Sequence, residues 1–426
     1  MEGISLGSSA ANGHAPDPEI NSGACAILAR LLSFLMLFFV STAIFAAEIP
    51  VGPLPASLCA SAKVIENERE GLWEKTLVVA FPKPRRTIST QEGFVDARAA
   101  VNHAMHPLLS QRFMSDSGAW RAYIDRIHGK VARNLKTKRS RLATMGTAAD
   151  MENLAVVIKE YAPFTVAVLV TAGAETNAVR TGVDEGIHIE TLHGTINILL
   201  LTNAQLSDGA LARAIVTVTE AKTAALEDLK VPSSYTKTVQ ATGTGTDNVI
   251  IFSGANGPKV TYTGGHSRIG ELIGKAAYSA VIEALGKQNG FLLPGVAPYV
   301  TKNSLRKQAT FESAEKWLLT LDSGDFSAAW DGASELVKQT KPPEVFRVSL
   351  EKTRASLGKA IERKTSRHLY TKAFSSLPRG EYMLLEFVGR FEKHAGELVE
   401  SLTLRRDEDG QWRVIDYSID HHEIDD

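Results

Sequence analysis

Short apolar runs alternate with longer helical patterns in the middle of the chain. Three runs, at residues 164–170, 195–201 and 248–252, are rich in β-branched residues and are bounded by Gly, Thr or Asn. Such runs are typical of strands that are buried on both faces. Apolar residues recur at helical spacing over 208–229 and 267–286. The alternation predicts an α/β fold in which helices cover a mixed or parallel sheet.

The preceding region predicts further elements of the same domain, which we place at 60–288. Residues 73–81 predict a first strand, and the prolines and basic residues at 82–86 are expected to end it. Helical patterns follow at 118–135 and at 150–160, and the second leads into the first buried strand.

The pattern changes in the last part of the chain. Residues 286–308 show no periodicity, so we predict a linker at 289–309. Helical segments follow, and then four alternating strands at 367–374, 381–391, 396–405 and 412–419, with Asp409-Gly410 as a hairpin turn between the last two. Residues 310–426 therefore predict a smaller α+β domain with a curved antiparallel sheet, which is expected to fold independently of the site.

The first 47 residues have the character of a leader. Residues 1–26 are rich in Gly, Ser, Ala, Asn and Pro and are expected to be disordered. Residues 31–47 form an apolar run of the length of a signal peptide or a marginal membrane anchor. Because Arg30 precedes this run, we expect the leader to contact the membrane and the remainder to be exported, either periplasmic or anchored at the outer face of the cytoplasmic membrane.

The composition of the 426-residue chain limits its partners. A formal net charge of −1 gives no reason to expect a nucleic-acid partner, and the basic run at 130–141 is typical of a solvated face. Cys25 and Cys59 are the two cysteines, and Cys25 lies in the leader, so neither a disulfide framework nor a cysteine metal site is predicted. We interpret His103 and His106 as a surface pair rather than metal ligands, so no metal site is predicted.

The helix predicted at 208–229 carries a lysine on its apolar stripe. Stepping by four and three residues from Leu211 through Ile215 and Val218 reaches Lys222. An ammonium group in that position must reach solvent or meet a carboxylate. We predict that its partner is Asp247, which directly precedes the strand at 248–252.

Two glycine-containing turns flank the last strand of this domain. Gly243 and Gly245 precede a strand, so they complete neither a P-loop nor a dinucleotide fingerprint. We expect them to let the backbone approach a bulky ligand closely. Gly264 and Gly265 open a helix, whose free N–H groups would form an oxyanion site beside His266.

The sequence shows no nucleophile motif, because it contains neither a Gly-x-Ser-x-Gly elbow nor a candidate reactive cysteine. Our catalytic candidates are therefore Asp247 or His266 as base, the Gly264-Gly265 amides as oxyanion donors, Lys222 as charge partner or acid, and Glu220. Each has a structural alternative: Asp247 suits a turn, His266 suits a helix cap, and Glu220 lies on a different helix face and suits a solvated position.

Residues 75–285 resemble the adenosylcobinamide amidohydrolase family. The resemblance runs through 86–102, 143–151, 171–182, 194–229, 241–253 and 262–273, and its most specific parts are TEAK at 219–222 and TGTGTD at 242–247. The chain differs at Gln91-Glu92-Gly93, where an Asn-Gly-Gly-like turn is expected. It also differs in its leader, because the family usually works in the cytoplasm.

The resemblance implies hydrolysis of the amide that joins cobyric acid to the aminopropanol arm of cobinamide or its adenosylated form, a step in corrinoid salvage and cobalamin remodelling. The corrinoid substrate carries the cobalt, and the protein itself needs no cofactor. We expect the following residues to bind it: Thr171, Gly173, Asn177, Asn197, Asn203, Gly243, Gly245, Thr246, Gly264 and Gly265. The alternatives are an exported corrinoid-binding protein without hydrolysis, or a hydrolase of a different amide, and any of these could form a homo-oligomer.

Residues 311–420 resemble a family of small exported domains of unknown function, through Trp317, Asp322, Trp330 and the stretch 410–417. They look like the cone-shaped fold of the nuclear transport factor type. That fold carries no fixed activity, so it adds no functional prediction.

Overall fold

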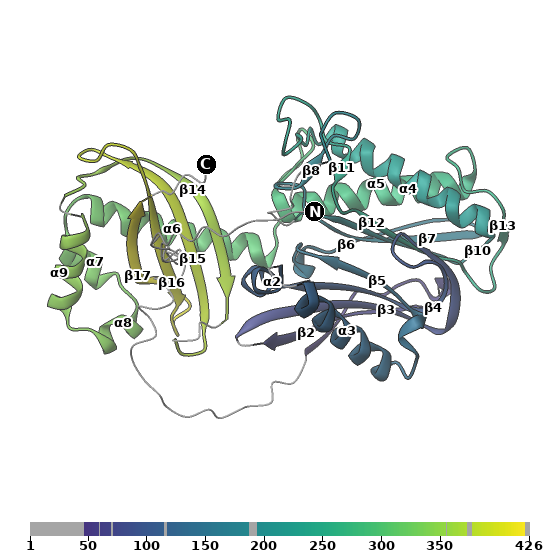
Figure 1. The fold of residues 1–426 in the computed structure, drawn as a ribbon, viewed down its shortest axis with the longest axis horizontal. Coiled ribbons are helices and arrows are strands. Elements are labelled where there is room, and N and C mark those ends of the chain that lie inside the picture. The colour runs from purple at the N-terminus through teal and green to yellow at the C-terminus, as the bar shows by residue number, and fades with distance from the viewer. Residues whose placement is uncertain are drawn as a thin grey trace, which may run out of the picture.

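The computed structural model describes residues 47–58, 60–69, 71–114, 117–186, 194–354, 356–372 and 377–421. All but the last residue of the predicted leader lies outside this part of the chain. Within the described ranges, no helix has the length and apolar character needed to cross a bilayer. The chain forms a large α/β domain and a smaller α+β domain (Figure 1).

The large domain is built on a mixed sheet, which contains nine strands within the described residues. These are β1 Ala47–Pro50, β2 Ser61–Arg69, β3 Leu72–Ser89, β4 Gly93–Met105, β5 Leu142–Thr147, β6 Ala155–Tyr161, β7 Phe164–Ala172, β9 Ile196–Thr202 and β12 Asn248–Phe252. Their order is β1-β2-β3-β12-β9-β7-β6, and β4 pairs with both β3 and β5. The pairs β12/β9 and β4/β5 are parallel and the other pairs are antiparallel, so the predicted fold class is confirmed in its mixed form.

Two long helices cover one face of this sheet (Figure 1). They are α4, Asp208–Asp228, and α5, Arg268–Asn289, close to the predicted ranges. Ser207 caps α4 by accepting the backbone N–H of Ala210. Strand β9 is buried along its whole length, and β7 and β12 are buried except for their first residues, as the apolar runs predicted.

The other face of the sheet curls over itself and encloses a second core. Side chains of β3, β4 and β5 pack there against β7, β9 and β12. Helix α3, Ser117–Asn134, covers the outside of the curl, and the short helix α2, Pro107–Met114, precedes it. Two short two-stranded sheets complete the domain: β8 Ala178–Val179 with β11 Gly243–Thr244, and β10 Gln205–Leu206 with β13 Lys259–Val260.

Two predictions in the large domain were wrong. Strand β3 does not end at the prolines of 82–86, because its register with β4 shifts between Ala80 and Arg85 and pairing then resumes. This irregularity places both prolines outside the ladder, where a missing N–H costs nothing. Residues 150–160 form a 3-10 turn, Met151–Asn153, followed by β6 rather than a helix. The β-branched run at 156–158 pairs with β7, and this pairing outweighs the helical spacing.

The small domain has four helices and a four-stranded antiparallel sheet within the described residues. These are α6 Lys302–Asp322, α7 Phe326–Asp331, α8 Glu335–Thr340, α9 Pro343–Arg354, β14 Ala360–Thr371, β15 Glu381–Phe391, β16 Glu397–Arg406 and β17 Trp412–His421. Its strands follow in sequence order, and Gly410 takes a positive φ of 81° in the predicted hairpin turn. The predicted linker is shorter than expected, because Thr301 and Ser304 form a capping box that starts α6 at Lys302.

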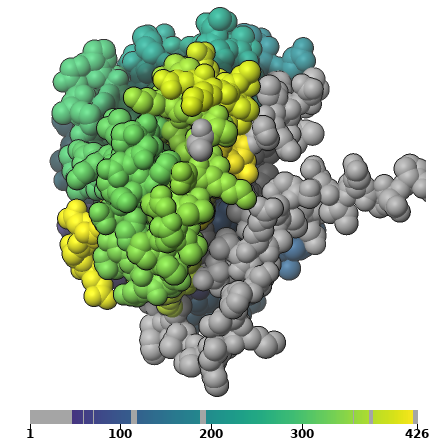
Figure 2. All heavy atoms as spheres, turned by 90° about the vertical axis from the view of Figure 1, so that its left-hand side faces the viewer, coloured from purple at the N-terminus to yellow at the C-terminus, as the bar shows by residue number. Residues whose placement is uncertain are grey.

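The two domains touch at the edge strand β14, at the segment that follows it and at the start of α6. The Nε2–H of buried His106 donates to the backbone carbonyl of Tyr370 at 3.0 Å, and Arg379 pairs with Glu68 at 2.5 Å. A cavity of about 130 Å³ between the domains is lined by Trp73 and Lys75 on one side and Tyr370 and Lys372 on the other. Seen from the small domain, the teal segments of the large domain appear above it (Figure 2).

Candidate functional site

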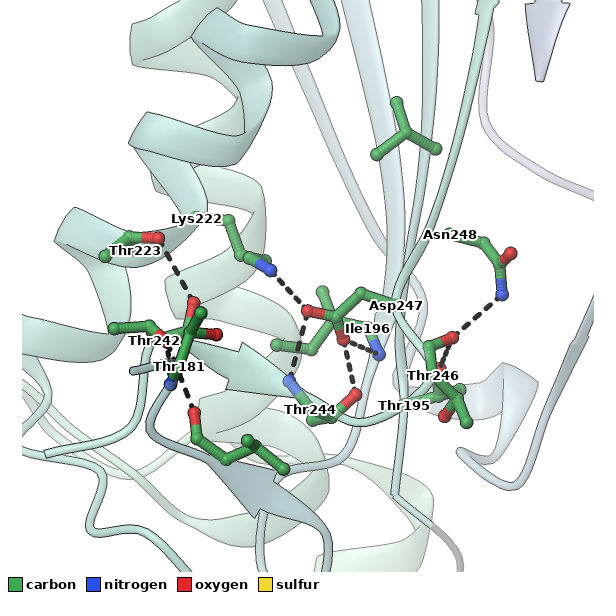
Figure 3. A network of polar contacts seen from close by, with 12 residues as sticks. Thr181, Thr195, Ile196, Lys222, Thr223, Thr242, Thr244, Thr246, Asp247 and Asn248 are labelled. Atoms are coloured by element: carbon green, nitrogen blue, oxygen red, sulfur yellow. Dashed lines mark hydrogen bonds and ion pairs between the residues drawn. The ribbon is translucent and has the colours of Figure 1, made fainter. Parts of the chain in front are cut away.

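The predicted pair of Lys222 and Asp247 is present. Lys222 projects from α4, and its ammonium group meets the Oδ2 atom of Asp247 immediately before β12 (Figure 3). The two side chains are 10% and 16% exposed. The pair therefore closes the space between α4 and the end of the sheet where β9 and β12 begin.

Asp247 is also bonded to three other groups, which organise the loop around it. Its Oδ1 atom accepts the backbone N–H of Ile196 at 3.1 Å and the hydroxyl of Thr244, and its Oδ2 atom accepts the N–H of Thr244 at 3.1 Å as well as Lys222. A carboxylate offers about four acceptor positions, and here all four are used. This geometry makes Asp247 an anchor for the strand and the loop in the resting state.

The two glycines before β12 leave room for neighbouring side chains, and at Gly243 these are the two charges of the pair. A Cβ atom on Gly243 would lie 2.5 Å from Oδ2 of Asp247 and 2.6 Å from Nζ of Lys222. A Cβ atom on Gly245 would lie 3.3 Å from Oδ1 of Asn177. We expected these glycines to let the backbone approach a bulky ligand, and that stays a prediction. The groups that lie closest to Gly243 here are the protein's own charges.

A second group of polar contacts supports the loop from the other side. The side-chain amide of Asn177 donates to the carbonyl of Gly194 at 2.9 Å, and the hydroxyl of Thr195 donates to the carbonyl of Thr246 at 2.8 Å. The N–H of Gly173 donates to the carbonyl of Thr195 at 2.9 Å. The predicted residues Gly173, Asn177 and Thr246 thus meet at this end of the sheet.

A row of amide side chains runs across the floor of the same end. Asn197 donates to Oδ1 of Asn102 at 3.0 Å and to the carbonyl of Gly146 at 2.8 Å, and Asn102 donates to the hydroxyl of Thr171 at 2.9 Å. The amide of Asn248 donates to Oδ1 of Asn197 at 3.3 Å. These residues come from β4, β5, β7, β9 and β12, so the row exists only once the sheet has curled.

The turn between β3 and β4 forms the exposed rim of this row. Glu92 accepts the hydroxyls of Ser89 and Thr144, each at 2.5 Å, and thereby ties the turn to β5. Thr90 and Gln91 donate to Oδ1 of Asn248 at 3.1 and 3.3 Å. Below, we call the group Ser89–Glu92, Asn102, Thr144, Thr171, Asn197, Thr246 and Asn248 the polar belt.

Two of the belt's central residues, Asn102 and Asn248, were not among our predictions. Asn248 starts a predicted strand directly beside Asp247, and this position was an available signal. Asn102 lies in a strand that we did not predict, and its partner Thr171 is distant in sequence. A single-sequence pattern contains no signal for that pairing.

The second predicted turn lies at the opposite end of the domain, so the candidates do not converge on one site. The Thr263 hydroxyl donates to the carbonyl of Ala210, in the first turn of α4, at 2.6 Å. Lys222 follows Ala210 by a helical rise of about 18 Å. His266 is exposed, and the cap of α5 is Ser267. The expected oxyanion site of Gly264 and Gly265 with His266 is therefore remote from Asp247.

Two more predicted site residues lie outside this region. Asn203 follows β9 at its far end, where it accepts the N–H of Thr165 at 2.9 Å and donates to the carbonyl of Pro163 at 2.9 Å. Its role there is to brace the turn between β6 and β7. Glu220 is exposed on α4, whereas Lys222 on the same helix is buried.

His103 and His106 are buried, which corrects our interpretation of a surface pair. His103 bonds to the hydroxyls of Thr76 at 2.9 Å and Tyr123 at 2.7 Å. Burial lowers the pKa of His103 to about 3 and that of His106 to about 4, so both rings are neutral at pH 7. Within the described ranges, no three His, Cys, Asp or Glu side chains gather as a metal site would require.

Comparison with known proteins identifies both domains. The family described as adenosylcobinamide amidohydrolase matches residues 59–292, which is more than half of the chain and contains the whole polar belt. A family of proteins of unknown function, DUF4019, matches residues 313–417.

Two relatives and one solved structure are also similar to this chain. An uncharacterized protein of Methanocaldococcus jannaschii is 40% identical over 240 residues, covering 52% of this chain and 91% of the relative. A Methanosarcina mazei protein named adenosylcobinamide amidohydrolase is 32% identical over 144 residues, covering 32% of this chain and 62% of the relative. A crystal structure from Pyrococcus horikoshii OT3 covers 50% of this chain and 77% of its own at 13% identity and a TM-score of 0.26, a likeness too weak to carry an argument. On the family match, this chain belongs to the adenosylcobinamide amidohydrolase family.

Proposed function

We propose that the large domain hydrolyses the amide between cobyric acid and the aminopropanol arm of adenosylcobinamide or cobinamide, and so serves corrinoid salvage. The observation that carries this proposal is the family match over residues 59–292. The relative from Methanosarcina mazei, which bears the name of this activity, supports it. The polar belt is the part of the domain that we assign to the substrate.

The exposed rim of the belt suits a corrinoid, whose edge carries many carboxamide groups. Gln91, Glu92 and Thr246 are exposed, and Asn248 is half-buried behind them. Amide side chains both donate and accept hydrogen bonds, so they complement the amides of a ligand. The buried Asn102 and Asn197 would then hold the rim in place rather than touch the substrate.

Amide hydrolysis also requires a group that activates water. We assign this role to Asp247, whose acceptor positions are filled in the resting structure. The Thr244 hydroxyl is the donor that can rotate away from Oδ1 most readily, because its loss leaves no backbone N–H unpaired. A water in its place would be bonded to Asp247, while Lys222 balances the carboxylate charge. The proton that Asp247 takes from this water would pass to the aminopropanol nitrogen as the C–N bond breaks. The cobalt enters with the substrate, and the proposed step uses no cofactor of the protein.

The test is to incubate the purified protein with adenosylcobinamide or cobinamide and to follow aminopropanol and cobyric acid by mass spectrometry. Wild-type protein should release both products. Asp247→Asn should reduce turnover on the order of 100-fold or more. Glu227→Gln changes an exposed carboxylate on α4, the helix that carries Lys222. It is the control and should leave turnover unchanged. Release of a different amine would redefine the substrate.

The runner-up function is an exported corrinoid-binding protein without hydrolysis. The complete hydrogen bonding of Asp247 within the protein favours this alternative. Binding of cobinamide with a change in its visible spectrum, but no aminopropanol after hours, would support it over the hydrolase.

We further propose that the domain works beyond the cytoplasmic membrane, because the apolar run at 31–47 follows Arg30. Alkaline phosphatase fused after residue 60 should be active in cells. An inactive reporter retained in the cytoplasm would refute export.

A further inference from the structure

A single carboxylate, Asp150, connects the two domains to the floor of the polar belt. Its Oδ1 atom accepts the ammonium of Lys75 at 2.6 Å, and its Oδ2 atom accepts the side-chain amide of Asn303 at 3.0 Å. Lys75 belongs to β3, and Asn303 lies in the first turn of α6. Asp150 therefore bonds to both domains at once.

The segment that carries Asp150 also supplies part of the belt. Gly146, four residues earlier, provides the carbonyl that orients Asn197. The N–H of Asp150 donates to the side-chain carbonyl of Gln288 at 3.1 Å, and Asn153 donates to the same atom at 2.8 Å. A displacement of Asp150 would thus shift Gly146 and the end of α5 as well.

The end of α5 holds a second loop of the site. Gln288 packs against Gly173, where an added Cβ would lie 3.8 Å from its Cγ atom. The neighbouring Asn289 accepts the N–H of Ala174 at 3.0 Å. The segments 146–153 and 173–174 are consequently fixed by the same helix end.

On its other side, Asn303 is held by the small domain. Its Oδ1 atom accepts an N–H of Arg306 at 2.7 Å, and the Arg306 guanidinium lies 3.6 Å from the centre of the Tyr370 ring on β14. Tyr370 in turn donates to Glu381 on β15 at 3.1 Å. These contacts form one continuous path from the sheet of the small domain to Asp150.

At this junction one ammonium, that of Lys75, faces three carboxylates: Asp150 at 2.6 Å, Glu152 at 3.1 Å and Glu66 at 4.0 Å. Burial acts to lower the pKa of Lys75, but Asp150 and Glu152 raise it above the ordinary value. Lys75 is 6% exposed and stays charged at neutral pH. Asn303 adds a hydrogen bond from a neutral amide to Asp150. This bond leaves the excess negative charge unchanged, so it sets the position of the carboxylate more than it compensates its charge.

We propose that the small domain is a positioning module for the hydrolase, and that Asn303 and Arg306 are the positioning residues through which it fixes segments 146–153 and 173–174. This inference rests on the proposed function for its catalytic consequence, but not for its structural one. It assigns the DUF4019 domain of this protein a role that depends on the docked arrangement and not on a ligand of its own.

The experiment compares the full-length wild type with Asn303→Ala, Asn303→Asp and Arg306→Ala. Gln308→Ala is the matched control, because Gln308 lies on the same helix, is exposed and bonds to Glu312 alone among the described residues. Amide hydrogen exchange should be faster at 146–153 in the three variants and unchanged in the control. Asn303→Asp should have the largest effect, because it places a carboxylate against Asp150.

In the hydrolysis assay the same variants should lose kcat by about 10-fold, since displacements of ~1 Å away from the chemistry can cost up to ~100-fold. The KM should change less than kcat. Unchanged exchange in all three variants would overturn the inference. An inactive wild type whose variants still show the graded exchange would instead overturn the proposed function and leave the positioning role supported.

Discussion

At the scale of single residues, the pair of Lys222 and Asp247 depends on a neighbour that has no side chain. The two charges lie where a Cβ of Gly243 would be, at 2.6 and 2.5 Å. The φ of Gly243 is not positive, so any residue could adopt its backbone conformation. A side chain is excluded at this position because there is no space for it. The charge pair can therefore form only because residue 243 is a glycine.

The charge pair should be energetically coupled. Lys222→Met leaves Asp247 without its counter-charge, and Asp247→Asn leaves a buried ammonium. Each change should lower the free energy of unfolding by roughly 3–5 kcal/mol, or somewhat less because the side chains keep slight contact with water. The double variant should cost less than the sum of the single variants, as measured by chemical denaturation. Additive losses would mean that the two groups do not interact.

Gly243 should also be sensitive to substitution. Gly243→Ala should lower the free energy of unfolding by about 1–3 kcal/mol, because the new methyl group displaces the pair. Gly265→Ala is the control, since an added Cβ there meets no atom within 4 Å. Equal stability of the two alanine variants, measured in the same denaturant, would contradict the steric explanation.

Sequence reasoning succeeded here where one periodic element was enough. The spacing from Leu211 to Lys222 fixed the side of the helix, and Asp247 was adjacent in sequence to a clear strand. It failed for Asn102 and Thr171, whose contact spans the interior of a curled sheet. It also failed for His266, because Asp247 precedes β12 whereas the turn with His266 follows it, so the two residues lie at opposite ends of that strand.

At the scale of elements, the curl depends on the long strand β3 and its partner β4. The buried His103 on β4 is bonded to Thr76 on β3 and to Tyr123 on α3, and Tyr123 donates to buried Glu74 at 3.0 Å. This network joins the helix to the outside of the curl. We could not predict it, because β4 has no clear alternation in sequence and the prolines suggested that β3 stops early.

The network predicts a loss of stability in acid. The pKa of His103 is about 3 in the folded protein, mainly through burial and further through His128 and Arg126, against 6.5 as its ordinary value. Between these values the unfolded chain binds the extra proton, so the free energy of unfolding falls as the pH falls below about 6.5. The contribution of His103 should reach about 1–3 kcal/mol at pH 4.5.

The measurement is chemical denaturation at pH 7, 5.5 and 4.5 for the wild type and His103→Gln. The variant removes this titration while it keeps a polar side chain, so its stability should depend less on pH. Carboxylates titrate in both proteins and cancel in the comparison. Parallel pH profiles would show that His103 does not contribute.

At the scale of the whole molecule, the sequence pattern separates the two domains, but it does not predict which residues join them. The change from alternating strands and helices to an antiparallel sheet predicts the boundary, and the two family models match residues 59–292 and 313–417. Docking depends on side chains such as Asn303 and Tyr370, which carry no periodic signal. The start of α6 inside the predicted linker shows the same limitation, because a capping box overrides weak periodicity.

The junction predicts that the domains unfold together. Glu400 in the small domain is fully buried and accepts Arg363 at 3.1 Å and the Tyr417 hydroxyl at 2.7 Å, so Glu400→Gln perturbs that domain alone. Lys222→Met perturbs the large domain alone.

If Asp150 and Asn303 couple the domains, each variant should melt in one calorimetric transition at a lower temperature than the wild type. In the Asn303→Ala background the same two substitutions should separate the transition into two, each shifted by its own substitution. Two independent transitions already in the wild type would show that the domains are merely neighbours, and the positioning role of the small domain would then lose its mechanical basis.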